Sequence, residues 1–320
     1  MIHRPHASMI CDVAHAFPPW VAKLLERDRS LRRNFREESI TDLLMASLVG
    51  LEALGIRVDF PDETKTGGDM EWVFAAPLEI KGGRYLRLIL QAKRPQYVKL
   101  KRGGYWCYKH LDHGDPPGQQ AQTLLAHASA SLGGKATLPL YIFYHPMSAL
   151  APSNGEPAIE GVNLVFADKV APVVNGGCGR KKKRVTYWRK HFMPLSDILC
   201  WPTVAAGPPV PPAPDLAQFV VGPAGWTVLP TTVGFHPDLV AHRLRHRRQI
   251  MGESPAESAA PVHEIEPAFG IPEDIRRAMV GEATDEERRK LKRPRVIFSS
   301  NLRRDDPFFD EAAERVLSRT

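Results

Sequence analysis

Two short runs in the chain combine the side chains that a phosphodiesterase needs. Asp69 and Glu71 lie in the run Gly-Asp-Met-Glu-Trp. Gln91 and Lys93 close the run Leu-Ile-Leu-Gln-Ala-Lys. Carboxylate and amide oxygens are ligands for Mg²⁺, and an ammonium group beside them stabilises negative charge on a phosphate. These residue types predict metal-dependent phosphodiester hydrolysis, provided that the fold brings the two runs together.

Both runs are expected to be strands of one hairpin. Side chains alternate between the faces of a strand, so Asp69 and Glu71 share a face in the first run, and Gln91 and Lys93 share a face in the second. The segment between the strands contains the pair Gly82-Gly83, which is a hairpin signal. A tight hairpin would bring two carboxylates, an amide and an ammonium group into one place.

The order of motifs resembles a known superfamily. Asp69 followed by Gln91-Ala92-Lys93 resembles the core motif of the PD-(D/E)xK nucleases, and the glutamine version (QxK) is similar to the Mrr-like branch of restriction endonucleases. Over roughly residues 35–200 the pattern also resembles a bacterial family of restriction-endonuclease-like proteins. Its elements are Glu-Glu-Ser-Ile-Thr-Asp at 37–42, Gly-Asp-Met-Glu-Trp at 68–72, Gln-Ala-Lys-Arg at 91–94 and a late Pro-Leu-Tyr-Ile-Phe-Tyr. Gln-Ala-Lys alone is a weak signal, and the specificity comes from the order of elements around it.

The resemblance implies an α/β fold, with a restriction-endonuclease-like αβββαβ core. A central mixed sheet would be flanked by helices, with a small C-terminal extension. The sequence supplies this order. A helix with one apolar stripe is expected over 36–54, a short strand over 57–60, then the hairpin, a second helix over 119–132 and a buried strand over 137–144.

The resemblance also assigns roles to the residues of the hairpin. Asp69 would bind Mg²⁺ or Mn²⁺, together with the side-chain oxygen of Gln91 and the backbone carbonyl of Ala92. Lys93 would orient or help deprotonate the attacking water, and Glu71 is an added catalytic candidate. Taken singly, Asp69 could be a turn residue, Gln91 an edge-strand residue and Lys93 a solvated charge. Because the three residues share one hairpin, a common functional role is the more attractive interpretation.

Two adjacent carboxylates compete for one further role. Glu37 and Glu38 lie in the first turn of the helix over 36–54, where acidic residues complement the helix dipole. The nuclease resemblance implies an acidic residue on this helix beside the metal. The sequence does not decide between Glu37 and Glu38, so both are candidate metal ligands and catalytic residues.

A polar and aromatic stretch follows Lys93. Its basic residues are interleaved with aromatic ones, the basic residues being Lys99, Lys101 and Arg102 and the aromatic residues Tyr97, Tyr105, Trp106 and Tyr108. The mixture suits phosphate contact with base or sugar stacking. A solvated loop whose aromatic residues pack locally explains the pattern equally well.

Two further segments are candidates for nucleic-acid binding. A basic run, Lys181, Lys182, Lys183 and Arg184, is followed by the aromatic pair Tyr187-Trp188. Such a run is usually only solvated, but the aromatic pair suggests a phosphate-binding arm. On the second helix, the resemblance places Gln119 or Gln122 beside the active site. A polar residue at a helix start is an equally good explanation of either glutamine.

The composition sets the outer bounds. The chain has 320 residues, of which 43% are hydrophobic and 25% charged, as in a globular protein, and its net charge of +7 favours a polyanionic partner. No apolar run is long enough to span a bilayer. The four cysteines, Cys11, Cys107, Cys178 and Cys200, are far apart in the sequence, which favours a reducing, cytoplasmic setting. Zinc at Cys107, His110 and His113 is disfavoured because a fourth ligand is missing.

The changes in composition divide the chain into three parts. Residues 1–200 are expected to form the nuclease-like domain, with its core at about 35–145. Residues 201–250 read as a proline-rich connection and a basic helix packed on or near that core. Residues 251–320 read as a linker and a small helical C-terminal appendage.

These observations predict a metal-dependent endonuclease that acts on DNA, with RNA as the other substrate considered. A role in restriction or antiphage defence in bacteria follows only from the resemblance. Double-strand cleavage commonly pairs two sites, which would make the chain a homodimer. Two other classes remain: a catalytically weak nucleic-acid-binding module, and a defence-system subunit that works only with a partner protein. No membrane partner is expected.

Overall fold

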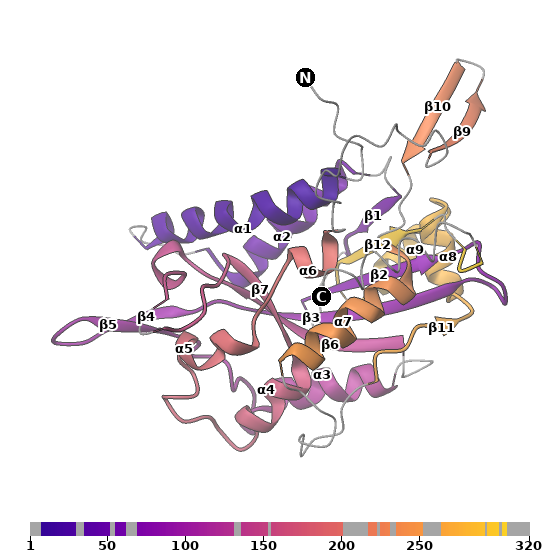
Figure 1. Cartoon of the computed structure of the whole chain (residues 1–320). Coiled ribbons are helices and arrows are strands. Elements are labelled where there is room, and N and C mark those ends of the chain that lie inside the picture. The colour runs from indigo at the N-terminus through magenta and orange to yellow at the C-terminus, as the bar shows by residue number, and fades with distance from the viewer. Residues whose placement is uncertain are drawn as a thin grey trace.

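The computed structural model contains a central mixed sheet with helices on both faces (Figure 1). It describes residues 8–29, 35–51, 55–61, 69–130, 136–152, 155–200, 217–222, 225–230, 235–251, 264–291, 293–300 and 303–305. The main path of the sheet runs in the order β1, β12, β2, β3, β6, β7, β8, and β11 pairs with β3 outside this path. The α/β class and the central mixed sheet predicted from the sequence are confirmed.

The strands of the sheet are β1 Ile56–Asp59, β2 Met70–Ala76, β3 Arg84–Lys93, β6 Thr137–Tyr144, β7 Val162–Phe166, β8 Met193–Pro194, β11 Ala268–Phe269 and β12 Arg295–Ser299. Two hairpins lie outside the sheet, β4 Gln96–Lys99 with β5 Gly104–Cys107, and β9 Ala217–Gly222 with β10 Gly225–Pro230. The α-helices are α1 Ser8–Asp28, α2 Glu37–Val49, α3 Gln119–Ala130, α4 Ala167–Val174, α5 Val185–Trp188, α6 Ser196–Leu199, α7 Pro237–Ile250, α8 Glu273–Met279 and α9 Asp285–Lys290. Short 3₁₀ turns are η3 Met147–Ala149 and η4 Arg189–His191.

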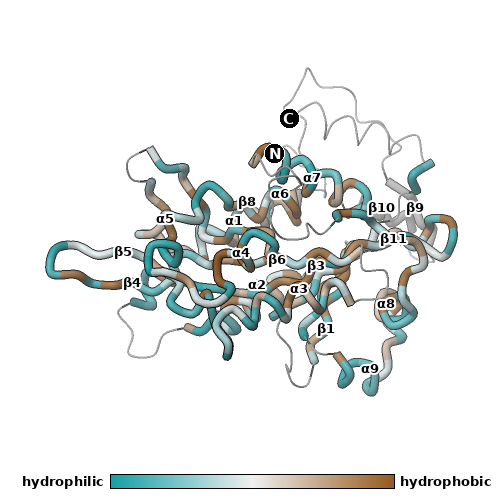
Figure 2. Tube along the Cα trace, turned by 90° about the horizontal axis from the view of Figure 1, so that it is seen from below, coloured by the Kyte–Doolittle hydropathy of each residue, from teal (hydrophilic) through white to brown (hydrophobic). Residues whose placement is uncertain are grey.

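Period-two alternation sorts the sheet into two buried faces. Trp72 of β2 and Leu90 of β3 pack in one core with residues of α1, α2, α6 and α7. Ile89 of β3 packs on the opposite face with residues of α3 and α4, and Val73 of β2 packs on that face with residues of α8. Figure 2 shows hydrophobic segments along β3, β6 and α3 in the middle of the molecule and a hydrophilic α9 at its edge. Because both faces are covered, β2 and β6 are buried along their whole length.

The predicted hairpin is present as β2 and β3. The two strands pair antiparallel, with Met70 opposite Leu90 and Ala76 opposite Arg84. The turn between them needs glycine at Gly83, which has φ 86° and where a Cβ atom would lie 2.6 Å from the side chain of Ile271. The opposite edge of β3 pairs in parallel with β6, as expected for a strand that follows a crossover helix.

The C-terminal part of the chain differs from the predicted linker and appendage. Strand β12 lies inside the sheet, antiparallel to β1 on one side and parallel to β2 on the other. Strand β11 pairs with β3, and α8 packs on the sheet. Strand β12 is only five residues long, with three consecutive apolar residues, and its partners are more than 200 residues away in sequence, so no local pattern revealed its place. The proline-rich stretch at 207–214 and most of the predicted linker lie outside the described residues.

Two further expectations have a structural outcome. The basic helix predicted before residue 250 is α7, and it packs on the core through buried Leu239, Val240 and Leu244. Cys11 and Cys200, which the sequence assigned to a reducing setting without any pairing, are joined by a disulfide in the structure. They are 189 residues apart, a pairing that only the packing of α1 against α6 creates. No helix within the described ranges is long and apolar enough to cross a membrane.

Candidate active site

The candidate site lies where β3 ends beside the start of β2. The N–H of Asp69 donates to the carbonyl of Leu90 at 2.8 Å, which places Asp69 opposite Gln91. The carboxylate oxygen Oδ2 of Asp69 accepts hydrogen bonds from Nε2 of Gln91 at 2.6 Å and from the N–H of Ala92. Asp69 is partly buried and Gln91 is buried. The two runs singled out in the sequence therefore meet, with the acid and the amide in contact.

Lys93 completes the group and is held by a residue that the sequence analysis missed. Its side chain is buried, and Nζ donates to Oε1 of Gln120 on α3 at 2.8 Å. The glutamines named in advance, Gln119 and Gln122, are both exposed on α3. The predicted helix is correct, but its rotation was not readable because three glutamines lie within four positions.

The rotation of α3 is fixed by the loop before it. Gly118 has φ 88°, and a Cβ atom there would lie 2.5 Å from the carbonyl oxygen of Val174 at the end of α4. The N–H of Gly118 donates to the carbonyl of Asp112 at 2.9 Å. This close approach locks the first turn of α3 against α4. Gln120 consequently faces β3, while Gln119 and Gln122 face outward.

The two acidic residues of α2 lie in different surroundings. Oε1 of Glu37 accepts a hydrogen bond from the N–H of Arg94 at 2.9 Å, directly after Lys93. Arg94 also forms an ion pair with the buried Asp28 of α1, at 3.1 Å. Glu38 is exposed. The structure therefore brings the carboxylate of Glu37 to the end of β3 and leaves Glu38 at the surface.

Glu71 is used elsewhere, which corrects its assignment as a catalytic candidate. Its Oε1 accepts from Nε of Arg87 at 2.7 Å, and its Oε2 lies 3.4 Å from Nε of Arg295. Burial alone would raise the pKa of Glu71, but the guanidinium groups of Arg295 and Arg87 outweigh it and keep the pKa below its ordinary value. Arg295 is directly opposite Glu71 on β12, so this carboxylate joins two strands instead of serving the site.

The environment of Asp69 raises its pKa, in contrast to that of Glu71. Burial raises the pKa of Asp69 to about 7, although the N–H of Ala92 and the charge of Lys93 act to lower it. The nearby carboxylates of Glu37 and Glu38 raise it further. Near neutral pH, an added positive charge would therefore strongly stabilise the ionised form of Asp69.

The oxygen atoms of the site fit a hard divalent cation. Gln91 Oε1 is buried and has no hydrogen-bond partner among the described residues, which is a costly arrangement for a polar atom. Both side-chain hydrogen bonds of Asp69 go to Oδ2. An oxygen donor set of this kind suits Mg²⁺ or Mn²⁺. Glu37 adds a second carboxylate. The N–H of Ala92 faces Asp69, and the expected role of the Ala92 carbonyl as a metal ligand stays a prediction.

A three-ligand group of His, Cys, Asp or Glu is found elsewhere in the described part of the chain. It consists of Cys11, His15 and Cys200. Of the residues considered for zinc in the sequence, Cys107 is buried and His110 and His113 are exposed. A cation at Asp69 would accordingly depend on two carboxylates and an amide.

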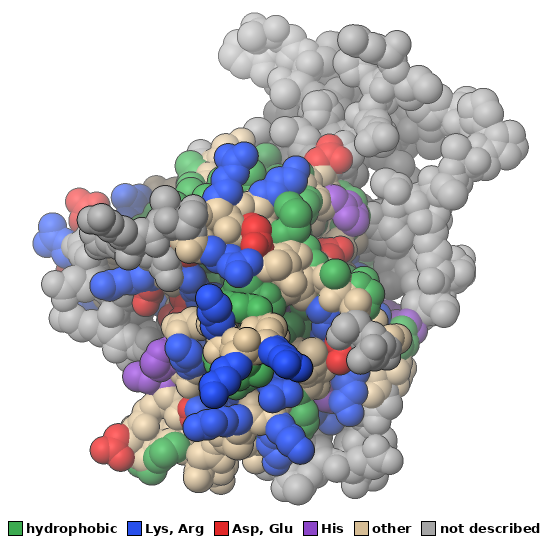
Figure 3. Space-filling model, turned by 90° about the vertical axis from the view of Figure 1, so that its left-hand side faces the viewer, with side chains coloured by type: hydrophobic (Ala, Val, Ile, Leu, Met, Phe, Trp, Pro, Cys, Tyr) green, Lys and Arg blue, Asp and Glu red, His purple; other side chains and the backbone are tan. Residues whose placement is uncertain are grey.

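The basic segments predicted to bind nucleic acid converge at one end of the molecule. The exposed residues Lys99, Lys101 and Arg102 lie on the β4–β5 hairpin, which extends from the end of the sheet where β3 finishes (Figure 1). The run at 180–184 lies beside it, because Cys107 bridges to Arg184. Figure 3 looks onto this end and shows Lys and Arg side chains gathered around hydrophobic ones. Lys181 and Lys182 are exposed as well.

Several of these side chains already have partners within the chain. Lys183 Nζ donates to Asp112 Oδ1 at 2.6 Å, and the guanidinium of Arg184 lies 4.3 Å from the ring centroid of Tyr105. The guanidinium of Arg29, which directly follows α1, lies 5.1 Å from the ring centroids of both Tyr97 and Trp106. Tyr108 is buried. These aromatic residues therefore pack locally, as the alternative of a loop with local aromatic packing predicts.

Comparison with known proteins gives a family but no function. The sequence profile of a family of unknown function, DUF6615, matches residues 10–311. The chain belongs to this family. The match to DUF6615 extends from α1 to beyond β12, so the family includes the hairpin site and the strand inserted beside it. No curated protein and no solved structure matches the chain.

The raised pKa of Asp69 predicts a pH-dependent stability. The folded protein binds this proton more tightly than the unfolded chain, whose aspartates titrate near pH 4, so stability falls as pH rises from about 4 to about 7. Asp69→Asn mimics the protonated acid. In EDTA the variant should exceed the wild-type free energy of unfolding at pH 8 by up to about 4 kcal/mol, and by little at pH 4.

Urea unfolding at both pH values measures this difference. Asp12→Asn, a change at an exposed position of α1, serves as the matched control and should leave the stability unchanged at either pH. A wild-type protein that is more stable than Asp69→Asn at pH 8 would show that Asp69 is not held in the buried environment described above.

Proposed function

We propose that the protein is a metal-dependent nuclease that hydrolyses phosphodiester bonds of DNA. The observation that carries the proposal is the assembly of Asp69, Gln91 and Lys93 at one end of β3, with a buried amide oxygen that has no hydrogen-bond partner among the described residues next to a partly buried carboxyl group. Individually these residues have simple structural explanations. Their convergence with Glu37 supplies oxygen ligands and a cationic group within one site.

The element order supports the proposed restriction-endonuclease-like core. The chain passes through α2, β1, β2, β3, α3 and β6, the αβββαβ order that the resemblance implies. The β4–β5 hairpin is inserted after β3, and β12 is inserted between β1 and β2 in the sheet. Both insertions leave the pairing of β2 with β3, and of β3 with β6, continuous at the site.

The chemistry can be divided among the residues of the site. Asp69, Gln91 and Glu37 would hold Mg²⁺ or Mn²⁺, Glu37 either directly or through water. When bound, such an ion supplies Lewis-acid stabilisation of the phosphate and lowers the pKa of a water. Lys93 orients the attacking water or helps to deprotonate it, and its charge stabilises the pentacovalent phosphate. Gln120 keeps Nζ of Lys93 in place while these steps occur.

The basic end of the molecule supports a polyanionic substrate. The exposed lysines and arginine of the β4–β5 hairpin follow Lys93 closely in sequence and extend from the same end of the sheet. Contacts of this kind bind phosphates without reading bases, so affinity should fall steeply with salt. We take DNA as the substrate and RNA as the competing one. The proposal also includes a role in bacterial defence, a homodimer and a cytoplasmic setting.

Two features of the site favour a second candidate function. Gln91 is neutral where an acidic residue is usual, and the pKa of Asp69 is about 7, so a cation must compete with a proton at neutral pH. Both features weaken metal binding. A nucleic-acid-binding protein with little activity, or a defence subunit activated by a partner, would have the same features.

The direct test of the proposal is a cleavage assay with Lys93→Ala. Wild-type protein should cut DNA in Mg²⁺ or Mn²⁺ and not in EDTA, and Lys93→Ala should lose at least about 100-fold in rate, because the variant lacks the cationic group beside the phosphate. Plasmid, linear and single-stranded DNA and RNA are compared. The matched control is Lys290→Ala, which removes an exposed lysine of α9.

The outcomes separate the two candidate functions. Cutting that persists in Lys93→Ala would contradict the assigned site. No cutting by the wild-type protein, combined with salt-sensitive binding of DNA, would favour the binding or partner-activated function.

Gln120 provides a second test on the same substrate. Gln120→Ala removes the acceptor that holds Nζ of Lys93, and we expect kcat to fall about tenfold with KM little changed, because the lysine stays present but is less ordered. Gln122→Ala changes an exposed glutamine on the same helix and should retain wild-type kcat. Equal losses in the two variants would mean that Gln120 acts only through the stability of α3.

A further inference from the structure

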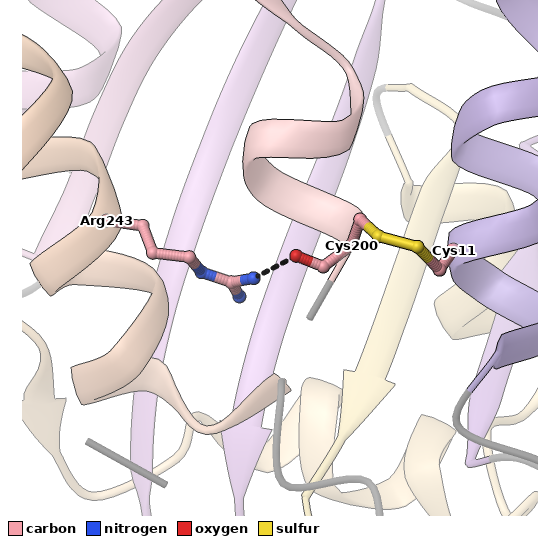
Figure 4. The surroundings of a disulfide bond; sticks show 3 residues. All are labelled: Cys11, Cys200 and Arg243. Carbon is pink, nitrogen blue, oxygen red and sulfur yellow. Dashed lines mark hydrogen bonds between the residues drawn. A yellow bond between two sulfur atoms is a disulfide. The ribbon is translucent and has the colours of Figure 1, made fainter. Parts of the chain in front are cut away.

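A second group of metal-ligand side chains lies between α1 and α6. Cys11 and His15 are four residues apart on α1 and therefore share one face of the helix. Cys200 directly follows α6, and Figure 4 shows its side chain meeting that of Cys11 between the two helices. The ligand atoms of Cys11, His15 and Cys200 all lie within 4.8 Å of one another. Three ligands suited to a soft metal ion are thus brought together, although Cys11 and Cys200 are 189 residues apart in the sequence.

We propose that the reduced protein binds one Zn²⁺ through Cys11, His15 and Cys200. Two thiolates and one imidazole are a preferred donor set for Zn²⁺, which binds such groups at about 2.0–2.3 Å in a tetrahedral arrangement. Tetrahedral geometry at these bond lengths separates the donor atoms by about 3.3–3.8 Å. A cluster within 4.8 Å needs only small side-chain movements to reach that geometry. This set differs from the oxygen ligands at Asp69 and would not serve the same ion.

A carboxylate lies close to the group. Oε2 of Glu160 is buried and has no hydrogen-bond partner among the described residues. Burial raises the pKa of Glu160, and His15 is near enough that its charge acts in the opposite direction. The carboxylate of Glu160 is not part of the group whose ligand atoms lie within 4.8 Å of one another, so water fills the fourth coordination position, as at other three-ligand Zn²⁺ sites.

The disulfide and the metal site are alternative states of the same two sulfur atoms. Cys11 and Cys200 are oxidised to a disulfide in the structure. A dithiol reductant transfers two electrons and two protons to this bond, yielding two thiols, and becomes a disulfide itself. Binding of Zn²⁺ then releases the two thiol protons to solvent, because thiolates are the ligands. In either state the sulfur atoms connect α1 to the end of α6.

The neighbouring contacts suit a structural role for this site. Arg243 of α7 donates to the carbonyl of Cys200 at 3.1 Å, which joins the chain after α6 to a third helix (Figure 4). Ala14 and Phe17 of α1 are buried in the core that also contains residues of α2. Zinc would therefore stabilise the layer of helices on this face of the sheet, independently of the proposed nuclease activity.

The test is zinc binding by the full chain after reduction. Protein reduced with dithiothreitol and desalted without oxygen is incubated with zinc sulfate, and bound metal is measured by mass spectrometry and by competition with a chromogenic chelator. We expect one zinc per chain, a loss of affinity of at least about 100-fold in Cys11→Ser and Cys200→Ser, and a loss of about tenfold or more in His15→Ala. Cobalt should give thiolate charge-transfer absorption in the wild-type protein.

The controls keep the result decisive. Cys178→Ser changes a partly exposed free thiol outside the group and should bind zinc like the wild type. His15 is exposed, so His15→Ala tests the site even if a cysteine variant fails to fold. The proposal is overturned if the reduced wild type binds no stoichiometric zinc, if His15→Ala and Cys11→Ser bind it as tightly as the wild type, or if the disulfide resists reduction in the folded protein.

Discussion

Seven residue pairs hold β2 against β3, from Met70 opposite Leu90 to Ala76 opposite Arg84, and the candidate site depends on this register. A slip of one position would move Gln91 and Lys93 to the opposite face of the sheet, into the core that α1 and α2 cover. The register is secured by the turn at Gly83 and by the apolar side chains that must face that core. The same pairing places Asp69 where its carboxylate meets Gln91 and the N–H of Ala92. The hairpin thus positions Asp69, Gln91 and Lys93, and α3 and α2 add Gln120 and Glu37 to the site.

Two carboxylates on that hairpin, two residues apart, acquire opposite properties from their neighbours. Glu71 lies between the guanidinium groups of Arg87 and Arg295, which keep its pKa low and fix it as an ion pair within the sheet. Asp69 is partly buried with weaker compensation from positive charge, and its pKa rises to about 7. The ionised form of such an acid costs stability unless a cation or proton joins it. The difference explains why Asp69, and not Glu71, is available for a metal ion.

The sequence predicted those features that local pattern determines. Period-two alternation and the glycine pair predicted the hairpin, and the continuous apolar run predicted β6. The first turn of α2 was also recognised as acidic, although only the structure shows Glu37 beside β3 and Glu38 at the surface. In each of these cases the relevant partners are close in sequence or the pattern repeats along one element.

Features that depend on distant partners were not readable. The insertion of β12 into the sheet, the ion pair of Glu71 with Arg295 and the Cys11–Cys200 link all join residues more than 180 positions apart. The choice of Gln120 over its neighbours depends on the contact of the loop before α3 with α4. Pairing of the hairpin aromatics with Arg29 likewise required the position of α1. Each of these contacts is set by packing, which a single sequence does not specify.

The central claim is that Asp69 and Gln91 together hold a divalent cation. The most direct measurement is an anomalous difference map from crystals of the protein soaked in Mn²⁺ above pH 7, where Asp69 is ionised. We expect a peak bonded to the Asp69 carboxylate and to Oε1 of Gln91, with Glu37 beside it or joined through water. Mn²⁺ bound at other positions with no peak between Asp69 and Gln91 would contradict it.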